Sequence, residues 1–295
     1  MRYRGVFTAM IAPMRDGELD QASVESLVDA QLEAGVDGLV VNGTTGEAAT
    51  LTGDEQAQLL EWVTERVEGR LPVIAGVGTN VTRTTVERAR RAEGMGVDGL
   101  LVVTPYYNKP TQEGLIEHFR TVAGSVSAST SIVLYNVPGR TAVSLAPESV
   151  ETLAVLPNVR AVKEATTDVD RAAAVIAAAG DNAAVLAGDD TAFLPMLALG
   201  AKGIVSAVSN VIPEPFVRTH KHFTWGDIDE AREVHYRYFE PTRALLSVVN
   251  PLGVKAAAQM TGLIASDEVR LPLVQMDDDA RARLRTALAA GGIVG

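Results

Sequence analysis

Short apolar runs alternate with longer amphipathic stretches along most of this 295-residue chain. The short runs lie between Gly or polar residues and are typical of buried strands. The longer stretches repeat apolar residues every three or four positions and therefore predict helices, among them 21–34, 54–68, 82–93 and 169–179. Eight runs fit the strand pattern, namely 5–11, 38–41, 73–75, 99–103, 131–135, 159–163, 184–187 and 203–205.

A weak internal repeat supports this alternation. The segments 35–39, 96–100 and 200–204 each place one Gly at the end of a helical stretch and a second Gly at the start of an apolar run. Successive segments are 61 and 104 residues apart. Because a strand with its helix takes about 30 residues, these spacings correspond to two such units and then to about four.

Eight strand–helix units predict an α/β fold, a closed (β/α)8 TIM barrel rather than an open sheet. We expect the barrel to span residues 1–225. Residues 226–295 contain helical patterns at 227–246, 251–260 and 277–290. We expect these to form a C-terminal helical extension that packs on the barrel.

Composition narrows the classes of function. The net charge of −11 argues against nucleic-acid and anionic membrane partners, since both favour basic surfaces. The chain has no Cys, which excludes disulfides, Cys-ligated zinc and a thiol nucleophile. The apolar runs are much shorter than the roughly 20 residues that cross a bilayer, and the first residues lack the apolar core of a secretion signal. We therefore expect a cytoplasmic protein.

Lys163 closes the apolar run 159–163, and Lys is scarce in this chain. Of its 26 Lys and Arg residues only five are Lys. A buried amine loses its proton more easily than an exposed one, and a neutral amine is the nucleophile that forms a Schiff base with a carbonyl substrate. The alternative is a Lys that reaches solvent from a strand end or pairs with a carboxylate.

Tyr135 ends the apolar run that lies one strand–helix unit before Lys163. Barrel enzymes build their sites at the ends of the strands and in the loops that follow them. Adjacent barrel strands would place the phenol and the amine on the same rim, where a phenol can shuttle protons as an imine forms and breaks. The alternative is a core Tyr with a satisfied hydroxyl.

Two further loops offer groups that bind carboxylates. The segment 43–47 presents the hydroxyls of Thr44 and Thr45 with backbone N–H groups on a Gly-rich turn. Arg140 follows a Pro-Gly turn, and a guanidinium fork suits a substrate carboxylate. The alternatives are an ordinary Gly turn and a surface Arg in a weak ion pair. No His or Glu at ligand spacing accompanies Asp189 and Asp190, which favours a helix N-cap or a polar wall of the site over a metal site.

These pieces together resemble the dihydrodipicolinate synthase family, within the N-acetylneuraminate lyase superfamily of class I aldolases. The resemblance runs over nearly the whole chain. It rests on five motifs that occur in order at predicted strand ends: 43–47, 104–110, 135–141, 163–165 and 188–190.

The resemblance implies a reaction between pyruvate and L-aspartate 4-semialdehyde. Lys163 would form the Schiff base with pyruvate, and Tyr135 would act as general acid and base. Thr44 and Thr45 would hold the pyruvate carboxylate. Arg140 would receive the carboxylate of the semialdehyde. The product would be 4-hydroxy-tetrahydrodipicolinate, which leads to diaminopimelate and lysine.

The resemblance also implies an assembly. Thr45 and Tyr107 would complete a proton relay with the general acid and base, Tyr107 reaching in from a neighbouring subunit. Gly188 and Val205 would line the pocket with backbone groups. The family is usually a homotetramer built as a dimer of dimers, and its members need no metal or organic cofactor.

Two other interpretations of the sequence are open, a related aldolase and a non-catalytic barrel. An N-acetylneuraminate lyase or a 2-keto-3-deoxy sugar-acid aldolase would share the Lys and the Tyr. The motifs around Arg140 and Tyr107 favour the synthase, and the sialate lyases typically have Ser-Thr in place of Thr44-Thr45. A non-catalytic barrel that serves as a binding protein should have lost Lys163 or Tyr135, and both are present.

Regulation by lysine is where the chain departs from the family pattern. Lysine-inhibited members carry polar or charged groups at an interface site that corresponds to the surroundings of Ala48, Gly53, Gln56, Asn80, Thr84 and Tyr106. Asn80 and Tyr106 match, whereas Gly53, Gln56 and Thr84 stand where sensitive forms have His or Glu. We predict weak or absent inhibition by lysine. A lysine titration of the purified enzyme checks this, and strong inhibition at physiological lysine levels would contradict it.

Overall fold

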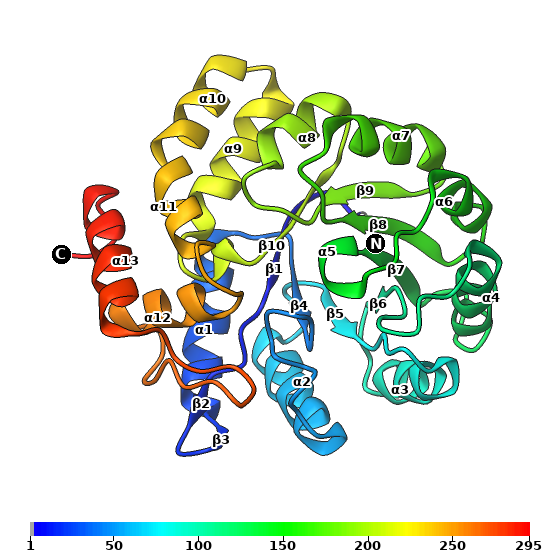
Figure 1. Cartoon of the computed structure of the whole chain (residues 1–295), viewed down its shortest axis with the longest axis horizontal. Helices are drawn as coiled ribbons and strands as arrows, with labels where there is room; N and C mark the ends of the chain where they lie inside the picture. Colours follow the sequence, from blue (N-terminus) through cyan, green and yellow to red (C-terminus); the bar gives the residue numbers. More distant parts are fainter. Residues whose placement is uncertain (1–2) are drawn as a thin grey trace. The chain divides into compact units, whose positions relative to one another are not determined.

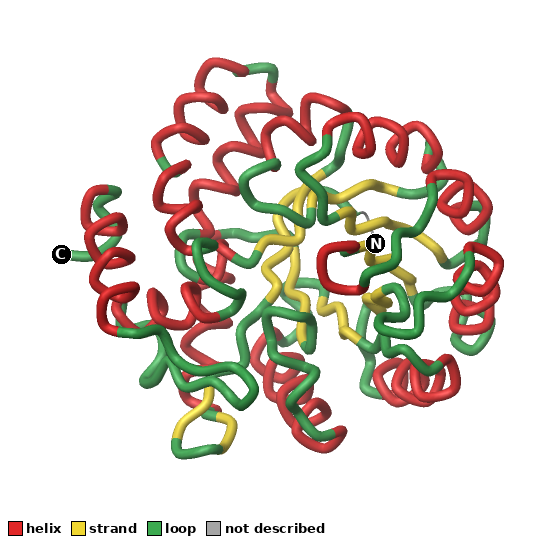
Figure 2. Tube along the Cα trace, viewed as in Figure 1, coloured by secondary structure: helices red, strands yellow, loops and turns green. Residues whose placement is uncertain are grey.

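Eight parallel strands form a closed barrel, as the sequence predicts. The computed structural model describes residues 3–295. Around the barrel the strands follow the order β1-β10-β9-β8-β7-β6-β5-β4. Helices alternate with these strands along the chain (Figure 2). The fold is therefore a (β/α)8 barrel with additional C-terminal helices.

Every predicted strand is present, with ends that differ by at most two residues. Ile11 lies outside the first strand because its N–H donates to the side-chain Oδ1 of Asn210 (3.0 Å) instead of to a neighbouring strand. The barrel strands are β1 (Gly5–Ala9), β4 (Gly38–Val41), β5 (Val73–Gly76), β6 (Gly99–Val103), β7 (Ser131–Asn136), β8 (Val159–Glu164), β9 (Ala184–Ala187) and β10 (Gly203–Ser206).

Several of the helices between the strands begin at a side-chain cap. Thr52, for example, forms a capping box with Glu55, which satisfies two backbone N–H groups at the start of α2. The first eight helices are α1 (Gln21–Ala34), α2 (Gly53–Val67), α3 (Thr82–Gly94), α4 (Gln112–Ala123), α5 (Pro138–Thr141), α6 (Pro147–Ala154), α7 (Val169–Ala179) and α8 (Phe193–Leu199).

The chain divides into two compact units. The first unit contains Pro72–Val205 together with the start of the chain up to Gly5. Within it, helices α3, α4, α6 and α7 lie along the outer side of strands β5 to β9 (Figure 1). The second unit contains Val6–Leu71 and Ser206–Gly295. It holds the β1–β4 pair, the first two helices and the C-terminal helices.

Two segments of the internal repeat, 35–39 and 96–100, contain an Asp that forms hydrogen bonds near the amino end of a strand in its own unit. Asp37 donates its N–H to the carbonyl of Val6 (2.7 Å), and its carboxylate accepts the N–H of Val6 (2.8 Å). Asp98 makes the same two hydrogen bonds to Val73, both at 2.9 Å. These two segments therefore lie where a helix ends and the next strand begins.

One short hairpin was not predicted. Strands β2 (Met14–Arg15) and β3 (Glu18–Leu19) pair antiparallel in the second unit. The turn residues Asp16 and Gly17 both have positive φ, 54° and 87°. This is the geometry of the two-residue turn that Asp-Gly favours, so the sequence did carry the signal.

The predicted helix 227–246 is wrong as one element. It consists of α10 (Ile228–Arg237) and α11 (Phe239–Leu245). Pro241 has no N–H, and its ring would clash with the carbonyl of Arg237 four residues earlier, so α10 cannot continue. The other elements of this region are η1 (Val208–Asn210), α9 (Pro213–Trp225), α12 (Leu252–Met260) and α13 (Asp278–Ala290).

The expected division of the chain at residues 225 and 226 falls between α9 and α10. That division stays a prediction, since the two compact units separate the chain elsewhere. Across residues 3–295, none of the helices combines the length and the apolar character needed to cross a membrane.

Candidate active site

Tyr135 and Lys163 lie side by side at the carboxyl ends of β7 and β8. They are register partners in the parallel pair, and the Lys163 Nζ lies 4.3 Å from the centroid of the Tyr135 ring. Both residues are buried, with 5% and 6% of their surface exposed. The structure therefore brings together the amine and the phenol that the sequence places on neighbouring strands.

A bulge sets this register. Ile132 pairs with Val159, but Val133 pairs with Ala161, so Arg160 is an extra residue in β8. Without the extra residue, Tyr135 would lie opposite Val162 and not opposite the lysine. The insertion of the exposed Arg160 therefore brings the Lys163 amine opposite the Tyr135 phenol.

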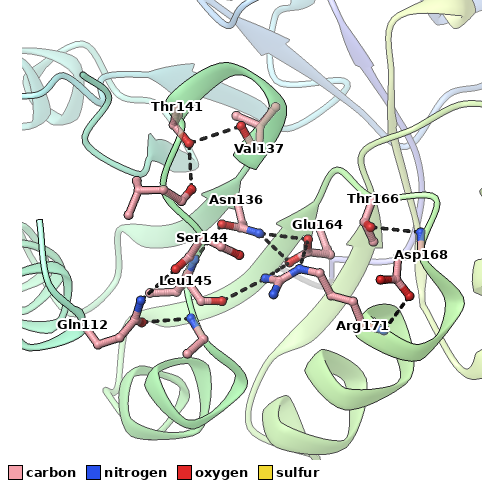
Figure 3. Close-up of polar contacts among 12 residues, drawn as sticks. Gln112, Asn136, Val137, Thr141, Ser144, Leu145, Glu164, Thr166, Asp168 and Arg171 are labelled. Carbon is pink, nitrogen blue, oxygen red and sulfur yellow. Dashed lines mark hydrogen bonds and ion pairs between the residues drawn. The ribbon is translucent and has the colours of Figure 1, made fainter. Parts of the chain in front are cut away.

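The next residue pair on the same strands, Asn136 and Glu164, is fully buried. Successive side chains on a strand point to opposite faces, so this pair faces away from the Tyr135–Lys163 side. The Glu164 carboxylate accepts hydrogen bonds from Asn136 and from the guanidinium of Arg171 (Figure 3). Its charge is therefore compensated by Arg171, behind the strands.

Arg140 lies on α5, the single helical turn that follows β7. It is exposed. The turn is held by Thr141, whose Oγ1 donates to the carbonyls of Val137 (3.2 Å) and Val143 (2.9 Å). The predicted guanidinium is thus presented to solvent from a short, hydrogen-bonded turn beside the end of the Tyr135 strand.

Gly188 follows β9 and Val205 lies in β10, both in the first unit. The Gly188 N–H donates to the carbonyl of Glu164 (2.8 Å), and a Cβ at Gly188 would come within 2.9 Å of the Ala165 backbone. Only glycine fits this close approach. Val205 lies in β10 and is 2% exposed.

Tyr107 is 88% exposed, on the loop that follows β6. Its backbone has a φ of 73°, an uncommon conformation for a bulky residue. Next to it, the Asn108 side chain donates to the carbonyl of Asn80 (2.9 Å). The structure therefore places the Tyr107 ring in solvent rather than against Tyr135.

Thr44 and Thr45 lie in the tight loop after β4, in the second unit. Thr45 is buried, and its Oγ1 accepts a hydrogen bond from the Nδ2 of Asn250 (3.0 Å). Thr44 is half-buried. A Cβ at Gly46 would meet the carbonyl oxygen of Met10 at 3.0 Å, so the loop lies against the backbone.

A fully buried ion pair anchors this loop, and the sequence reasoning missed it. Lys255 on α12 donates to the Oε1 of Glu47 and to the carbonyl of Glu268, both at 2.5 Å. The second carboxylate oxygen of Glu47 accepts the N–H of Arg270 (3.2 Å). The side chains of Lys255 and Glu47 are 0% and 1% exposed. A Lys within the apolar helical stretch 251–260 was the available signal.

The two buried lysines, Lys255 and Lys163, therefore differ in their chemical surroundings. Burial lowers the pKa of the Lys255 amine, and the Glu47 carboxylate opposes that shift. Its hydrogen bonds to Glu47 and Glu268 enclose the amine, so a substrate has no approach to it. Lys163 lies near the carboxyl end of β8, beside a phenol, and forms no ion pair among residues 3–295. Lys163 is thus the amine that is placed to act as a nucleophile.

Metal-ligating side chains do not gather in the described part of the chain: residues 3–295 hold no group of three or more His, Asp or Glu arranged around a cation site. Asp189, after β9, instead accepts the N–H and the hydroxyl of Thr191 at 3.0 and 2.6 Å. That oxygen is engaged in the turn that begins at Asp189.

Fold and site define a (β/α)8 barrel that presents a buried amine beside a phenol at its strand ends, an arrangement suited to Schiff-base chemistry. The dihydrodipicolinate synthetase family model matches residues 2–291. The chain belongs to this family.

Individual relatives are similar over their whole length. The 4-hydroxy-tetrahydrodipicolinate synthase of Nitratidesulfovibrio vulgaris is 44% identical, and the match covers 100% of both chains. The crystal structure of dihydrodipicolinate synthase from Thermotoga maritima is 41% identical, with a TM-score of 0.97 over 100% of both chains. That of dihydrodipicolinate synthase from Acinetobacter baumannii complexed with pyruvate is 38% identical, with a TM-score of 0.95 over 99% of both chains.

The buried pair beside the Thr44–Thr45 loop gives a test of stability. Replacement of Lys255 by Met leaves Glu47 as a buried charge without its partner, so we expect Lys255→Met to lower the free energy of unfolding by about 3–5 kcal/mol. The double variant Glu47→Gln, Lys255→Met removes both charges and should recover part of that loss. Urea unfolding measures both. A loss below about 1 kcal/mol in the single variant would contradict a strong pair.

Proposed function

We propose that this protein condenses pyruvate with L-aspartate 4-semialdehyde to form 4-hydroxy-tetrahydrodipicolinate, on the route to diaminopimelate and lysine. The observation that carries the proposal is the buried Lys163 amine, 4.3 Å from the ring centroid of Tyr135, in a chain of this family. The relative from Acinetobacter baumannii, a dihydrodipicolinate synthase complexed with pyruvate, supports the first substrate.

The proposed chemistry begins at Lys163. Its amine attacks the ketone carbon of pyruvate, and loss of water gives an imine whose positive nitrogen withdraws electrons from the neighbouring methyl group. Removal of a methyl proton then gives an enamine. Tyr135 donates the proton that leaves with the hydroxyl and accepts protons in the later steps, because its phenol lies beside the amine at the strand end.

The pyruvate carboxylate is assigned to the hydroxyls of Thr44 and Thr45 and to backbone N–H groups of their loop. The Oγ1 of Thr45 accepts from Asn250, which leaves the hydroxyl proton of Thr45 available to donate. This assignment also supplies the proton relay with Tyr135. Gly188 and Val205 would line the pocket with backbone groups.

The second substrate is assigned to Arg140. The enamine carbon attacks the aldehyde carbon of the semialdehyde and forms the new C–C bond, and the aldehyde oxygen takes up a proton. The amino group of the adduct then attacks the imine carbon, which closes the ring and releases Lys163. Arg140 would bind the semialdehyde carboxylate. Such a local cation is needed because the net charge of −11 repels anionic substrates.

The assembly is proposed to be a homotetramer built from two dimers. Tyr107 is 88% exposed in the single chain and its neighbour Tyr106 is 38% exposed, and adjacent exposed aromatic rings are typical of a surface that another subunit covers. We assign Tyr107 to the site of a neighbouring subunit, where its phenol would complete the relay of Thr45 and Tyr135. Biosynthesis of an amino acid favours a cytoplasmic location.

Comparison of aldehydes tests the proposed reaction. With pyruvate present, L-aspartate 4-semialdehyde should be consumed faster than N-acetylmannosamine or a sugar aldehyde. Arg140→Ala should lower kcat/KM for the semialdehyde by about 10- to 100-fold, the value of one or two hydrogen bonds to a charged group. The pyruvate imine should still form in this variant.

Coupled spectrophotometry measures turnover, and mass spectrometry after borohydride reduction measures the imine. Faster turnover of a sugar aldehyde would favour the lyase reading. Loss of the imine in folded Arg140→Ala would contradict the place assigned to Arg140.

A further inference from the structure

A buried polar network lies behind the Tyr135–Lys163 pair and reaches the loop that carries Arg140. We call Asn136, Leu145, Glu164 and Arg171 the Glu164 network (Figure 3). It joins the ends of two barrel strands to α7 and to the segment that follows α5. None of its four members has a part in the chemistry described above.

The centre of the network is the carboxylate of Glu164, which is 0% exposed. Asn136 donates its Nδ2 to both carboxylate oxygens, at 2.9 and 3.1 Å. Arg171 donates Nε to one oxygen (3.0 Å) and Nη2 to the other (3.2 Å). A buried charge needs such full pairing, so the positions of Asn136 and Arg171 are tightly determined.

The network also closes the loop. The chain leaves β7 at Asn136 and returns at Leu145, nine residues later. The N–H of Leu145 donates to the Oδ1 of Asn136 (2.8 Å), and its carbonyl accepts from the Nη2 of Arg171 (2.9 Å). Both backbone polar groups of Leu145 are therefore held by the side chains that neutralise Glu164.

The rest of the loop is fixed from the other side. Gln112 at the start of α4 donates its Nε2 to the carbonyl of Ser144 (2.8 Å) and accepts the N–H of Ala146 (2.9 Å) at its Oε1. Thr104 donates to the hydroxyl of Thr141 (3.2 Å). Arg140 directly precedes Thr141 and lies between Asn136 and Leu145, so its backbone position follows from these attachments.

We propose that Asn136 and Arg171 are positioning residues that set the place of Arg140 and thereby the selection of a carboxylate-bearing aldehyde. The inference rests on the proposed function, in which Arg140 binds the second substrate. The register of Tyr135 and Lys163 is set by the backbone ladder of β7 and β8. Loosening the loop should therefore weaken binding of the aldehyde and spare formation of the pyruvate imine.

Arg171→Lys tests this with the charge retained. A lysine ammonium can neutralise Glu164, but it cannot reproduce the planar fork that bonds both carboxylate oxygens and the carbonyl of Leu145. We expect the KM for L-aspartate 4-semialdehyde to rise about tenfold, and the preference for it over an aldehyde without a carboxylate to fall by a similar factor. The KM for pyruvate and the fraction of Lys163 trapped by borohydride should change less than about twofold.

A second variant keeps the test informative if Arg171→Lys fails to fold. The double variant Glu164→Gln, Arg171→Gln removes both charges, so no uncompensated carboxylate is buried. It still lacks the guanidinium that holds Leu145, and the same rise in the aldehyde KM is expected. The matched control is Asn158→Ala. Asn158 is also buried and donates to the carbonyl of Ala123 (2.9 Å), but it lies at the amino end of β8.

The outcomes separate the two proposals. A rise confined to the aldehyde KM in the Arg171 variants, with both KM values unchanged in Asn158→Ala of similar melting temperature, supports the positioning role. Unchanged aldehyde KM in a folded Arg171 variant overturns it, as does a parallel change of both KM values. Absence of a pyruvate imine in the unaltered protein would instead overturn the proposed function itself.

Discussion

The parallel pairing of β7 with β8, in the register that sets Tyr135 opposite Lys163, is the constraint on which the site depends. A slip of one residue would turn Lys163 to the outer face and bring Glu164 to the inner one. The bulge at Arg160 and the backbone ladder of β7 and β8 provide the register. On the opposite face, the Glu164 network holds Leu145 in the loop that follows β7.

In each unit of the chain, a buried carboxylate with its own cationic partner holds a loop. In the first, Glu164 is paired with Arg171, which also holds the carbonyl of Leu145 in the loop after α5. In the second, Glu47 is paired with Lys255 and fixes the turn that contains Thr44 and Thr45. Both carboxylates have a positive partner of their own, and neither is paired with Lys163. This distribution leaves the reactive amine beside a phenol instead of in an ion pair.

The barrel and its strand ends could be predicted from the sequence, because short apolar runs and Gly-flanked helices are visible in residues that lie next to one another along the chain. The place of Lys163 beside Tyr135 followed from one strand–helix unit of spacing. The bulge at Arg160 could not be predicted, since one charged residue in an apolar run equally fits a regular strand with that side chain in solvent. The pair of Glu47 with Lys255 spans 208 residues, and only the closed fold reveals such a contact. The break before α11 could have been predicted from Pro241.

The most direct measurement is reduction with borohydride in the presence of pyruvate, followed by peptide mass mapping. Lys163 and Lys255 are both buried, and they differ in that Lys255 is enclosed by Glu47 and Glu268. We predict one adduct per chain, on the peptide that contains Lys163, and none on Lys255. A folded protein that gives no adduct, or that carries it on Lys255, would contradict the assignment of Lys163 as the imine-forming residue.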